Sequence, residues 1–147
     1  MAADRVVSDS IVINAPAAKI FDLLADPRRH GSIDGSGALR GTVSGPERLG
    51  LGDRFGMQMR IVLPYRVINT VVEYEPDRRI AWQHVARHTW RYELSPAGPD
   101  QTTVTESWDW SGSPVARPME LMDFPAKNTQ AIRRTLRRLK QVIEETP

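Results

Sequence analysis

Glu106 and His84 have the chemistry to move a proton or to anchor a polar ligand. Glu106 stands between Val104 and Trp108 in a strand-like segment, so alternation turns its carboxyl to the same side as these apolar residues. A carboxylate on such a face needs a partner or a raised pKa. His84 falls on the matching face of a nearby predicted strand, and we expect it to be that partner. The pair would act as general acid and base or as static hydrogen-bond anchors, and the alternative is a structural pair near the sheet end.

A second candidate pair, His30 and Asp34, lies in the glycine-rich segment 29–37. Functional residues often sit on loops held by a rigid scaffold, and the alternative is an ordinary flexible loop. The three histidines, at 30, 84 and 88, lack the spacing of metal ligands, so we predict no metal site. No nucleophile stands beside the candidate acids and bases, which disfavours acyl and phosphoryl transfer. The glycines form no phosphate-binding motif, and we predict no cofactor.

Three predicted strands carry large aromatic side chains on one face, which indicates a concave, sparsely polar binding wall. The opposite faces carry mainly solvent-type residues, such as Arg79, Ala81 and Gln83. The alternative is that these aromatic side chains simply fill the core. The residues that we expect to line a ligand are Met57, Met59, Trp82, Trp90, Tyr92, Trp108, Trp110, His30 and Asp34.

The elements that would hold these residues follow from periodicity and from turn signals. A first strand is predicted over 6–13, and Pro16 suits the first position of the short helix that follows. A second short helix is predicted over 27–32 and a short strand over 39–44. An antiparallel meander then covers 53–63, 65–74, 80–85, 88–94 and 102–110. Residues 55, 57, 59, 61 and 63 share one face of the first of these meander strands.

The last third of the chain is helical in pattern. One or two turns are predicted over 116–122, and Pro125 begins or kinks a long helix. Its apolar stripe comprises Ile132, Leu136, Leu139 and Ile143, all of which we expect to face the sheet. The basic residues on the rest of its surface are interpreted as a solvated face, and binding of nucleic acid or of an anionic membrane is the lesser alternative.

This order of elements resembles the START-like, or Bet v 1-like, helix-grip superfamily (SRPBCC), and within it the bacterial polyketide cyclase/dehydrase and lipid-transport group. The segments that carry the likeness are 11–16 with 20–27, 72–76 with 80–82, 90–94, 103–106 and 135–140. The resemblance implies one α+β domain over residues 1–147, in which a curved antiparallel sheet grips a long C-terminal helix. It also implies a ligand cavity with segment 29–37 near its mouth, and it carries over no catalytic motif.

Composition narrows the function classes. The 147 residues suffice for one core, and the absence of cysteine excludes disulfides and thiolate metal sites. A net charge of +2 is too small to indicate nucleic-acid binding. No run approaches the roughly 18 apolar residues of a membrane span, and the first residues lack a signal-peptide pattern, so we expect a cytoplasmic protein without stable membrane insertion.

The sequence thus predicts a protein that binds a small hydrophobic molecule, such as a lipid, a polyketide or a quinone, between sheet and helix. One alternative is an aromatase/cyclase- or dehydratase-type enzyme that uses His84 with Glu106, or His30 with Asp34, for proton transfer. The other is a protein-interaction module with a filled core.

Overall fold

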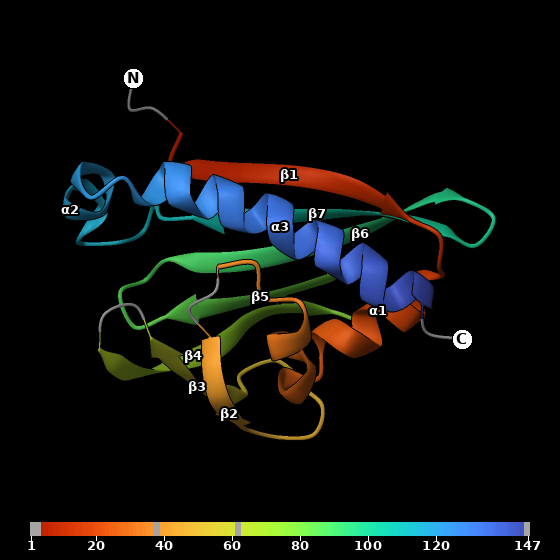
Figure 1. The fold of residues 1–147 in the computed structure, drawn as a ribbon, viewed down its shortest axis with the longest axis horizontal. Coiled ribbons are helices and arrows are strands. Elements are labelled where there is room, and N and C mark those ends of the chain that lie inside the picture. The colour runs from red at the N-terminus through yellow and green to blue at the C-terminus, as the bar shows by residue number, and fades with distance from the viewer. Residues whose placement is uncertain (1–3, 37–38, 61–62, 146–147) are drawn as a thin grey trace.

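Seven antiparallel strands form the sheet in the computed structural model, which describes residues 4–36, 39–60 and 63–145. The strands are β1 (Val6–Ile13), β2 (Leu39–Ser44), β3 (Arg54–Arg60), β4 (Pro64–Glu75), β5 (Arg79–His84), β6 (Thr89–Gly98) and β7 (Gln101–Asp109). Their order is β1-β7-β6-β5-β4-β3-β2, so the meander from β2 to β7 ends beside β1. The sheet curves strongly and encloses the helices on its concave side (Figure 1).

Two short helices follow β1. In α1 (Ala17–Leu24), Ile20, Phe21, Leu23 and Leu24 are buried, and Pro16 stands immediately before the first helical residue. The 3-10 helix η1 (Pro27–Ser32) is capped by Asp26, whose side chain accepts a hydrogen bond from the Arg28 N–H at 3.0 Å. Pro27 occupies the first turn, where its missing N–H is not needed. The cap fixes where η1 begins, and His30 on this helix thereby lies against the concave face of the sheet.

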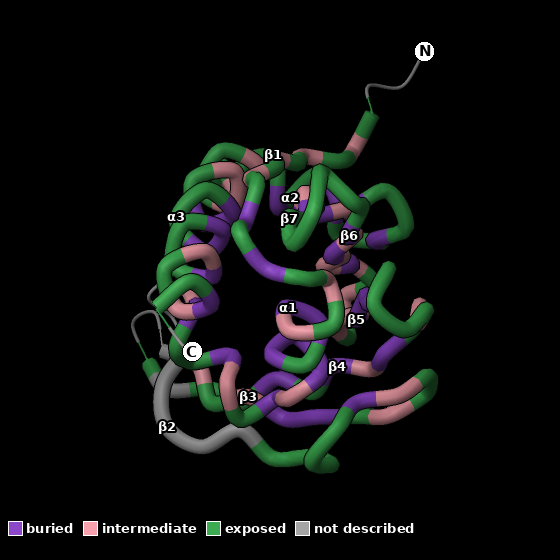
Figure 2. The backbone as a smooth tube through the Cα atoms, turned by 90° about the vertical axis from the view of Figure 1, so that its right-hand side faces the viewer, coloured by how far each residue is buried: buried purple, intermediate pink, exposed green. Residues whose placement is uncertain are grey.

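The long helix α3 (Phe124–Glu145) lies along β1 and β7 and follows the short helix α2 (Ala116–Leu121) (Figure 1). Ile132, Leu136, Leu139 and Ile143 are all at most 2% exposed, which confirms the predicted stripe. Figure 2 shows α3 buried along the side that faces the sheet and exposed along the other. The α+β helix-grip architecture expected from the element order is therefore confirmed.

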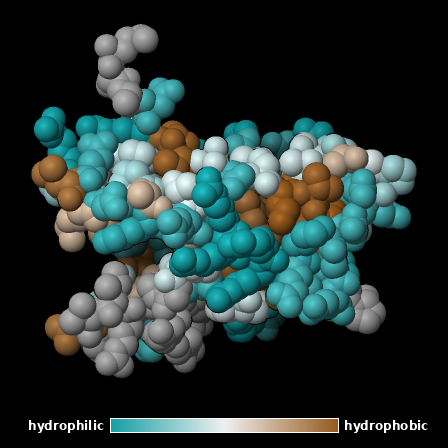
Figure 3. Space-filling view, turned by 45° about the horizontal axis from the view of Figure 1, so that its top comes forward, coloured by the Kyte–Doolittle hydropathy of each residue, from teal (hydrophilic) through white to brown (hydrophobic). Residues whose placement is uncertain are grey.

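The basic surface of α3 forms contacts with neighbouring elements as well as with solvent. Arg133 pairs with Asp9 of β1 at 3.3 Å, and the Lys140 ammonium donates to the Val12 carbonyl oxygen at 3.0 Å. Arg138 donates to the backbone carbonyl oxygen of Asp34. Figure 3 shows a largely hydrophilic surface over this face of the molecule. These side chains tether the helix to β1 and to the loop after η1.

The first strand of the meander is shorter than predicted, and Ala81 is more buried than its outward face suggests. The segment predicted as one strand over 53–63 ends as β3 at Arg60, and Pro64 begins β4 as its first residue, a position that tolerates proline. Leu63, which was predicted to share the face of Phe55, is 73% exposed, and Ile61 lies outside the described residues. Ala81 is fully buried although it faces outward, because the Arg91 and Glu73 side chains of the adjacent strands pair beside it at 2.6 Å.

Candidate functional site

Glu106 is the buried carboxyl that alternation predicted. It lies on the inner face of β7, is 3% exposed, and its direct cross-strand neighbours are Tyr92 on β6 and Asp9 on β1. Burial raises the pKa of Glu106 to about 8, the negative charge of Asp34 adds to this rise, and a hydrogen bond from the Tyr92 hydroxyl opposes it. At neutral pH the carboxyl is therefore mostly protonated, and its Oε1 atom has no hydrogen-bond partner among the described residues.

Tyr92 supports this carboxyl from the neighbouring strand. Its ring is 4% exposed, and burial together with the nearby charges of Glu106 and Asp34 raises the pKa of its phenol well above the ordinary value. The phenol therefore remains protonated throughout the physiological pH range and can donate a hydrogen bond to Glu106.

Asp34 is held near these two groups by a close contact between its loop and α3. The N–H of Gly35 donates to the Thr135 hydroxyl at 2.9 Å. A Cβ atom at Gly35 would come within 2.5 Å of the Thr135 backbone nitrogen and 2.6 Å of the Ala131 carbonyl oxygen, so only glycine fits there. The Asp34 carboxylate itself accepts from the Ser36 N–H at 3.0 Å and from its hydroxyl at 2.6 Å.

His30 belongs to the core and not to the cavity mouth where the family resemblance placed it. It is 5% exposed, and its Nε2 atom donates to the Leu24 carbonyl oxygen at 2.8 Å, which leaves Nδ1 as an acceptor. Burial lowers the pKa of His30, so the ring is neutral at pH 7. The Nδ1 atom is buried and has no partner among the described residues.

Trp82 lies between His30 and Tyr92 and contacts both rings. Its ring stacks on His30 at 4.9 Å between centroids and lies 5.6 Å from the ring of Tyr92. Phe55 of β3 meets both His30 and Trp82 edge-on, at 5.5 and 5.3 Å. We call the group formed by His30, Asp34, Trp82, Tyr92 and Glu106 the buried polar cluster. It combines one neutral acceptor, one protonated acid and an aromatic wall.

The pairing of His84 with Glu106 was wrong. Across the sheet, Glu106 on β7 is opposite Tyr92 on β6, and Tyr92 is opposite Ile80 on β5. His84 lies four residues beyond Ile80 on β5, so it is displaced from this row by roughly 13 Å at about 3.3 Å per residue. His84 instead stacks on His88 at 4.6 Å, next to the turn between β5 and β6. The strand register, which alternation does not reveal, makes Tyr92 the partner of Glu106.

The remaining predicted ligand residues lie on the inner face but differ in the extent of their burial. Trp108 is fully buried, and its indole N–H donates to His88 Nδ1 at 2.9 Å. Trp110 stacks on Trp108 at 4.6 Å and donates to Glu120 of α2 at 3.1 Å. Trp90, Met57 and Met59 are partly buried, and Trp90 and Met57 pack against the core. Sequence reasoning missed Thr135, whose only signal is a hydroxyl beside the apolar stripe of α3.

Within the part of the chain that the structure describes, no helix is long and apolar enough to cross a bilayer.

Residues 4–144 match the model of a family described as polyketide cyclase/dehydrase and lipid transport. An uncharacterised protein of Mycobacterium tuberculosis, Rv0088, is 36% identical over 138 residues, which cover 90% of this chain. The aligned part spans only 62% of that relative's length.

Solved structures share the fold at low sequence identity. Protein MLL2253 from Mesorhizobium loti has a TM-score of 0.72 at 16% identity, with 97% of this chain and 99% of that chain covered. Norcoclaurine synthase from Thalictrum flavum, in complex with dopamine and hydroxybenzaldehyde, has a TM-score of 0.68 at 12% identity, with 99% and 89% covered. At these identities the likeness concerns the fold alone.

Proposed function

Since the chain belongs to the polyketide cyclase/dehydrase and lipid transport family, we propose that it binds a small, largely apolar molecule between the inner face of the sheet and α3. The buried polar cluster would hold the polar groups of that molecule. The observation that carries the proposal is the pair of buried polar atoms, His30 Nδ1 and Glu106 Oε1, that find no hydrogen-bond partner among the residues that the structure describes. Buried polar atoms in folded proteins are nearly always hydrogen-bonded, and leaving one unpaired costs about 1–3 kcal/mol.

The chemistry of the two atoms indicates what the ligand carries. His30 Nδ1 accepts a hydrogen bond, because Nε2 holds the proton for Leu24. The protonated carboxyl of Glu106 offers a donor at neutral pH, since Tyr92 already donates to it. A ligand with a hydroxyl group and a carbonyl group on an aromatic or acyl body would satisfy both atoms, and Trp82 would contact the body between them.

Binding of 6-acetyl-2-naphthol, compared with 2-ethylnaphthalene, tests this proposal by isothermal titration calorimetry. We expect the hydroxy ketone to bind about tenfold or more tightly than the hydrocarbon, the difference that one net hydrogen bond of about 1.4 kcal/mol makes. Glu106→Gln and His30→Phe should each reduce this preference. The matched control is Glu75→Gln, at an exposed position at the end of β4. Absence of binding by both probes, with no co-purified molecule in native mass spectrometry, would favour a protein-interaction module instead.

A second candidate function is proton transfer at a carbon next to a ligand carbonyl. Glu106 is protonated at pH 7 because its pKa is about 8, and His30 is neutral because its pKa is lowered. Each group is therefore in the form that an acid and a base need. In a second binding mode, with the carbonyl rather than the ligand body between the two groups, Glu106 would donate to the carbonyl oxygen while His30 Nδ1 removes the α-proton. Norcoclaurine synthase, which shares the fold, was solved with hydroxybenzaldehyde, an aldehyde, and this supports the proposal.

Exchange of the acetyl protons of 6-acetyl-2-naphthol in D₂O separates the two functions. An enzyme of this type should accelerate exchange, followed by proton NMR, and Glu106→Gln should slow it by about 10²–10⁴-fold at saturating ligand, a much larger loss than the roughly tenfold loss of binding. A binding protein would leave the exchange rate at the level of the buffer alone.

A further inference from the structure

The outer face of the sheet carries a hollow that is separate from the buried polar cluster. It has a volume of about 400 Å³, a size typical of small-molecule sites. It lies over β3, β4 and β5 at the end of the sheet where the β5–β6 turn projects. The residues that line it are Arg54, Ile68, Thr70, Gln83, His84, Val85 and Arg87. We call it the outer groove.

The strand register builds the floor of the outer groove. Arg54 on β3 is opposite Thr70 on β4, and Thr70 is opposite Gln83 on β5, so these three side chains form one row across the sheet. Their sequence neighbours Phe55, Val71 and Trp82 are buried on the inner face, which places the row on the outer side. A guanidinium, a hydroxyl and an amide thus stand side by side, and all three can donate hydrogen bonds.

The charge balance of the groove differs from that of the rest of the outer face. Elsewhere on the same face the arginines are paired: Arg79 pairs with Glu93 at 3.0 Å, and Arg91 pairs with Glu73 at 2.6 Å. Asp109, which continues the row of Gln83 two strands away on β7, lies 3.8 Å from Arg91. The outer groove contains two arginines and no carboxylate among its lining residues. Within the described part of the chain, neither Arg54 nor Arg87 has a carboxylate within 4 Å.

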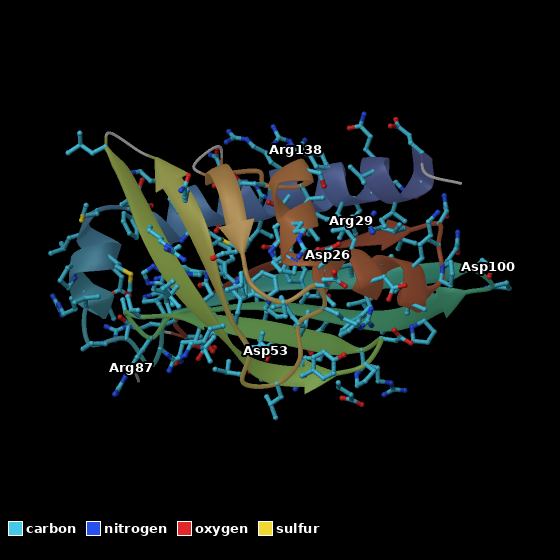
Figure 4. The ribbon with its side chains drawn as sticks, turned by 90° about the horizontal axis from the view of Figure 1, so that it is seen from below. Asp26, Arg29, Asp53, Arg87, Asp100 and Arg138 are labelled. Carbon is cyan, nitrogen blue, oxygen red and sulfur yellow. The ribbon has the colours of Figure 1, made fainter. Side chains whose placement is uncertain are left out.

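Arg87 occupies a backbone conformation that favours glycine. Its φ angle is 59°, in the left-handed region, at the end of a turn closed by a hydrogen bond from its N–H to the His84 carbonyl oxygen at 2.9 Å. Figure 4 shows Arg87 at the end of the molecule opposite Asp100, which marks the β6–β7 turn. A charged side chain therefore stands beside the groove at a position where the backbone alone would prefer glycine.

We propose that the outer groove binds the anionic group of a small organic molecule, a carboxylate or a phosphate monoester, between Arg54 and Arg87. Thr70 and Gln83 donate further hydrogen bonds to that group. The apolar part of the ligand lies on Ile68 and Val85, which are 37% and 75% exposed. The site is on the opposite side of the sheet from Glu106 and does not depend on the function proposed for the buried polar cluster.

Titration of the ¹⁵N-labelled protein with phenyl phosphate, followed by NMR, tests the proposal. Saturable shifts should appear at the amides of Thr70, Gln83 and Arg87. Inorganic phosphate should bind at least about threefold more weakly, because it lacks the apolar part. Arg54→Gln and Arg87→Gly should each weaken binding at least about fivefold, as expected for loss of a charge-assisted contact. The Arg87→Gly variant suits the left-handed backbone, so it should fold at least as well as the natural chain.

Two controls make the result decisive. Arg137→Gln on the exposed face of α3 removes the same charge elsewhere and should leave the dissociation constant unchanged. Glu106→Gln should also leave it unchanged, which separates this site from the buried polar cluster. The proposal is overturned by shifts that do not saturate, by equal weakening in Arg137→Gln, or by equal binding of inorganic phosphate. Binding to phosphatidylglycerol vesicles without binding of phenyl phosphate overturns it in favour of a membrane surface.

Discussion

Tyr92 and Glu106 face each other directly across β6 and β7, and the interaction with the Tyr92 phenol opposes the rise that burial causes in the pKa of Glu106. Both side chains are at most 4% exposed, so bulk water does not solvate the pair. One oxygen of the carboxyl remains without a partner in the described chain. This arrangement ties the stability of the fold to the protonation of a single buried acid.

The contribution of Glu106 to the stability should fall as the pH rises from about 4.5 to about 8, and the protein itself should lose stability above about pH 6.5, where the opposing effect of His88 has ended. The folded pKa of Glu106 is raised from 4.5 to about 8, so in this range the folded state holds a proton that the unfolded state has lost. Urea unfolding across this pH range should show the decline, which amounts to a few kcal/mol at most. Glu106→Gln should remove most of it. An equally steep decline in that variant would show that another group is responsible.

His88 should cause a loss of stability on the acid side. Burial, and secondarily the nearby His84, lower the pKa of His88 to about 4. Between about pH 6.5 and pH 4, His88 is therefore protonated in the unfolded state and neutral in the folded state. Stability should therefore decrease by about 2–3 kcal/mol as the pH falls through this window. NMR titration of the imidazole protons checks the pKa directly. A midpoint near 6.5 would contradict the burial of His88 against Trp108.

Gly35→Ala should destabilise the fold by about 1–3 kcal/mol, the usual effect of overpacking. The added methyl group would meet backbone atoms of α3 at 2.5–2.6 Å, and backbone atoms cannot rotate away. Thermal unfolding measures the effect. Gly112→Ala is the matched control, since its nearest contact is an ordinary 3.7 Å from the Arg87 carbonyl oxygen. Equal stability of the two variants would disprove the close contact between the loop and α3.

Leu136→Ala should cost about 2–5 kcal/mol, because it removes a large side chain from a closely packed core. Leu136 is 2% exposed at the centre of the buried stripe of α3. Its exposed neighbour Arg137, changed to alanine, provides the control and should stay within about 0.5 kcal/mol of the natural protein. Chemical denaturation gives both values, and a loss below about 0.5 kcal/mol for Leu136→Ala would contradict the packing.

An apolar ligand should quench tryptophan emission through the inner face of the sheet. Trp82, Trp90 and Trp108 occupy one row across β5, β6 and β7, so a molecule against this row would lie close to all three rings. We expect Trp90→Phe and Trp108→Phe to reduce the quenching produced by a fatty acyl probe. Fluorescence titration provides the measurement. Unchanged quenching in both variants would place the ligand elsewhere.

The sequence by itself determined which face of each element is buried, because alternation in strands and the 3–4-residue repeat in helices are local properties. The inward positions of Glu106 and Tyr92, the stripe of α3 and the bounds of η1 and β2 all follow from such patterns. The family resemblance agrees with the family match over residues 4–144. Leu63 is exposed although alternation places it with Phe55, since a strand end is decided by the turn that follows it.

Only the tertiary structure decided which inward residues meet. Strand register joins Glu106 to Tyr92 and separates it from His84, and register depends on turn lengths and on packing across the whole sheet. Contact between Gly35 and Thr135 joins segments 100 residues apart, which no local pattern encodes. His30 was predicted to lie in a loop at the cavity mouth, yet the cap at Asp26 and the stack on Trp82 hold it inside the core. Local patterns therefore select the side chains of the site, and long-range packing decides their partners.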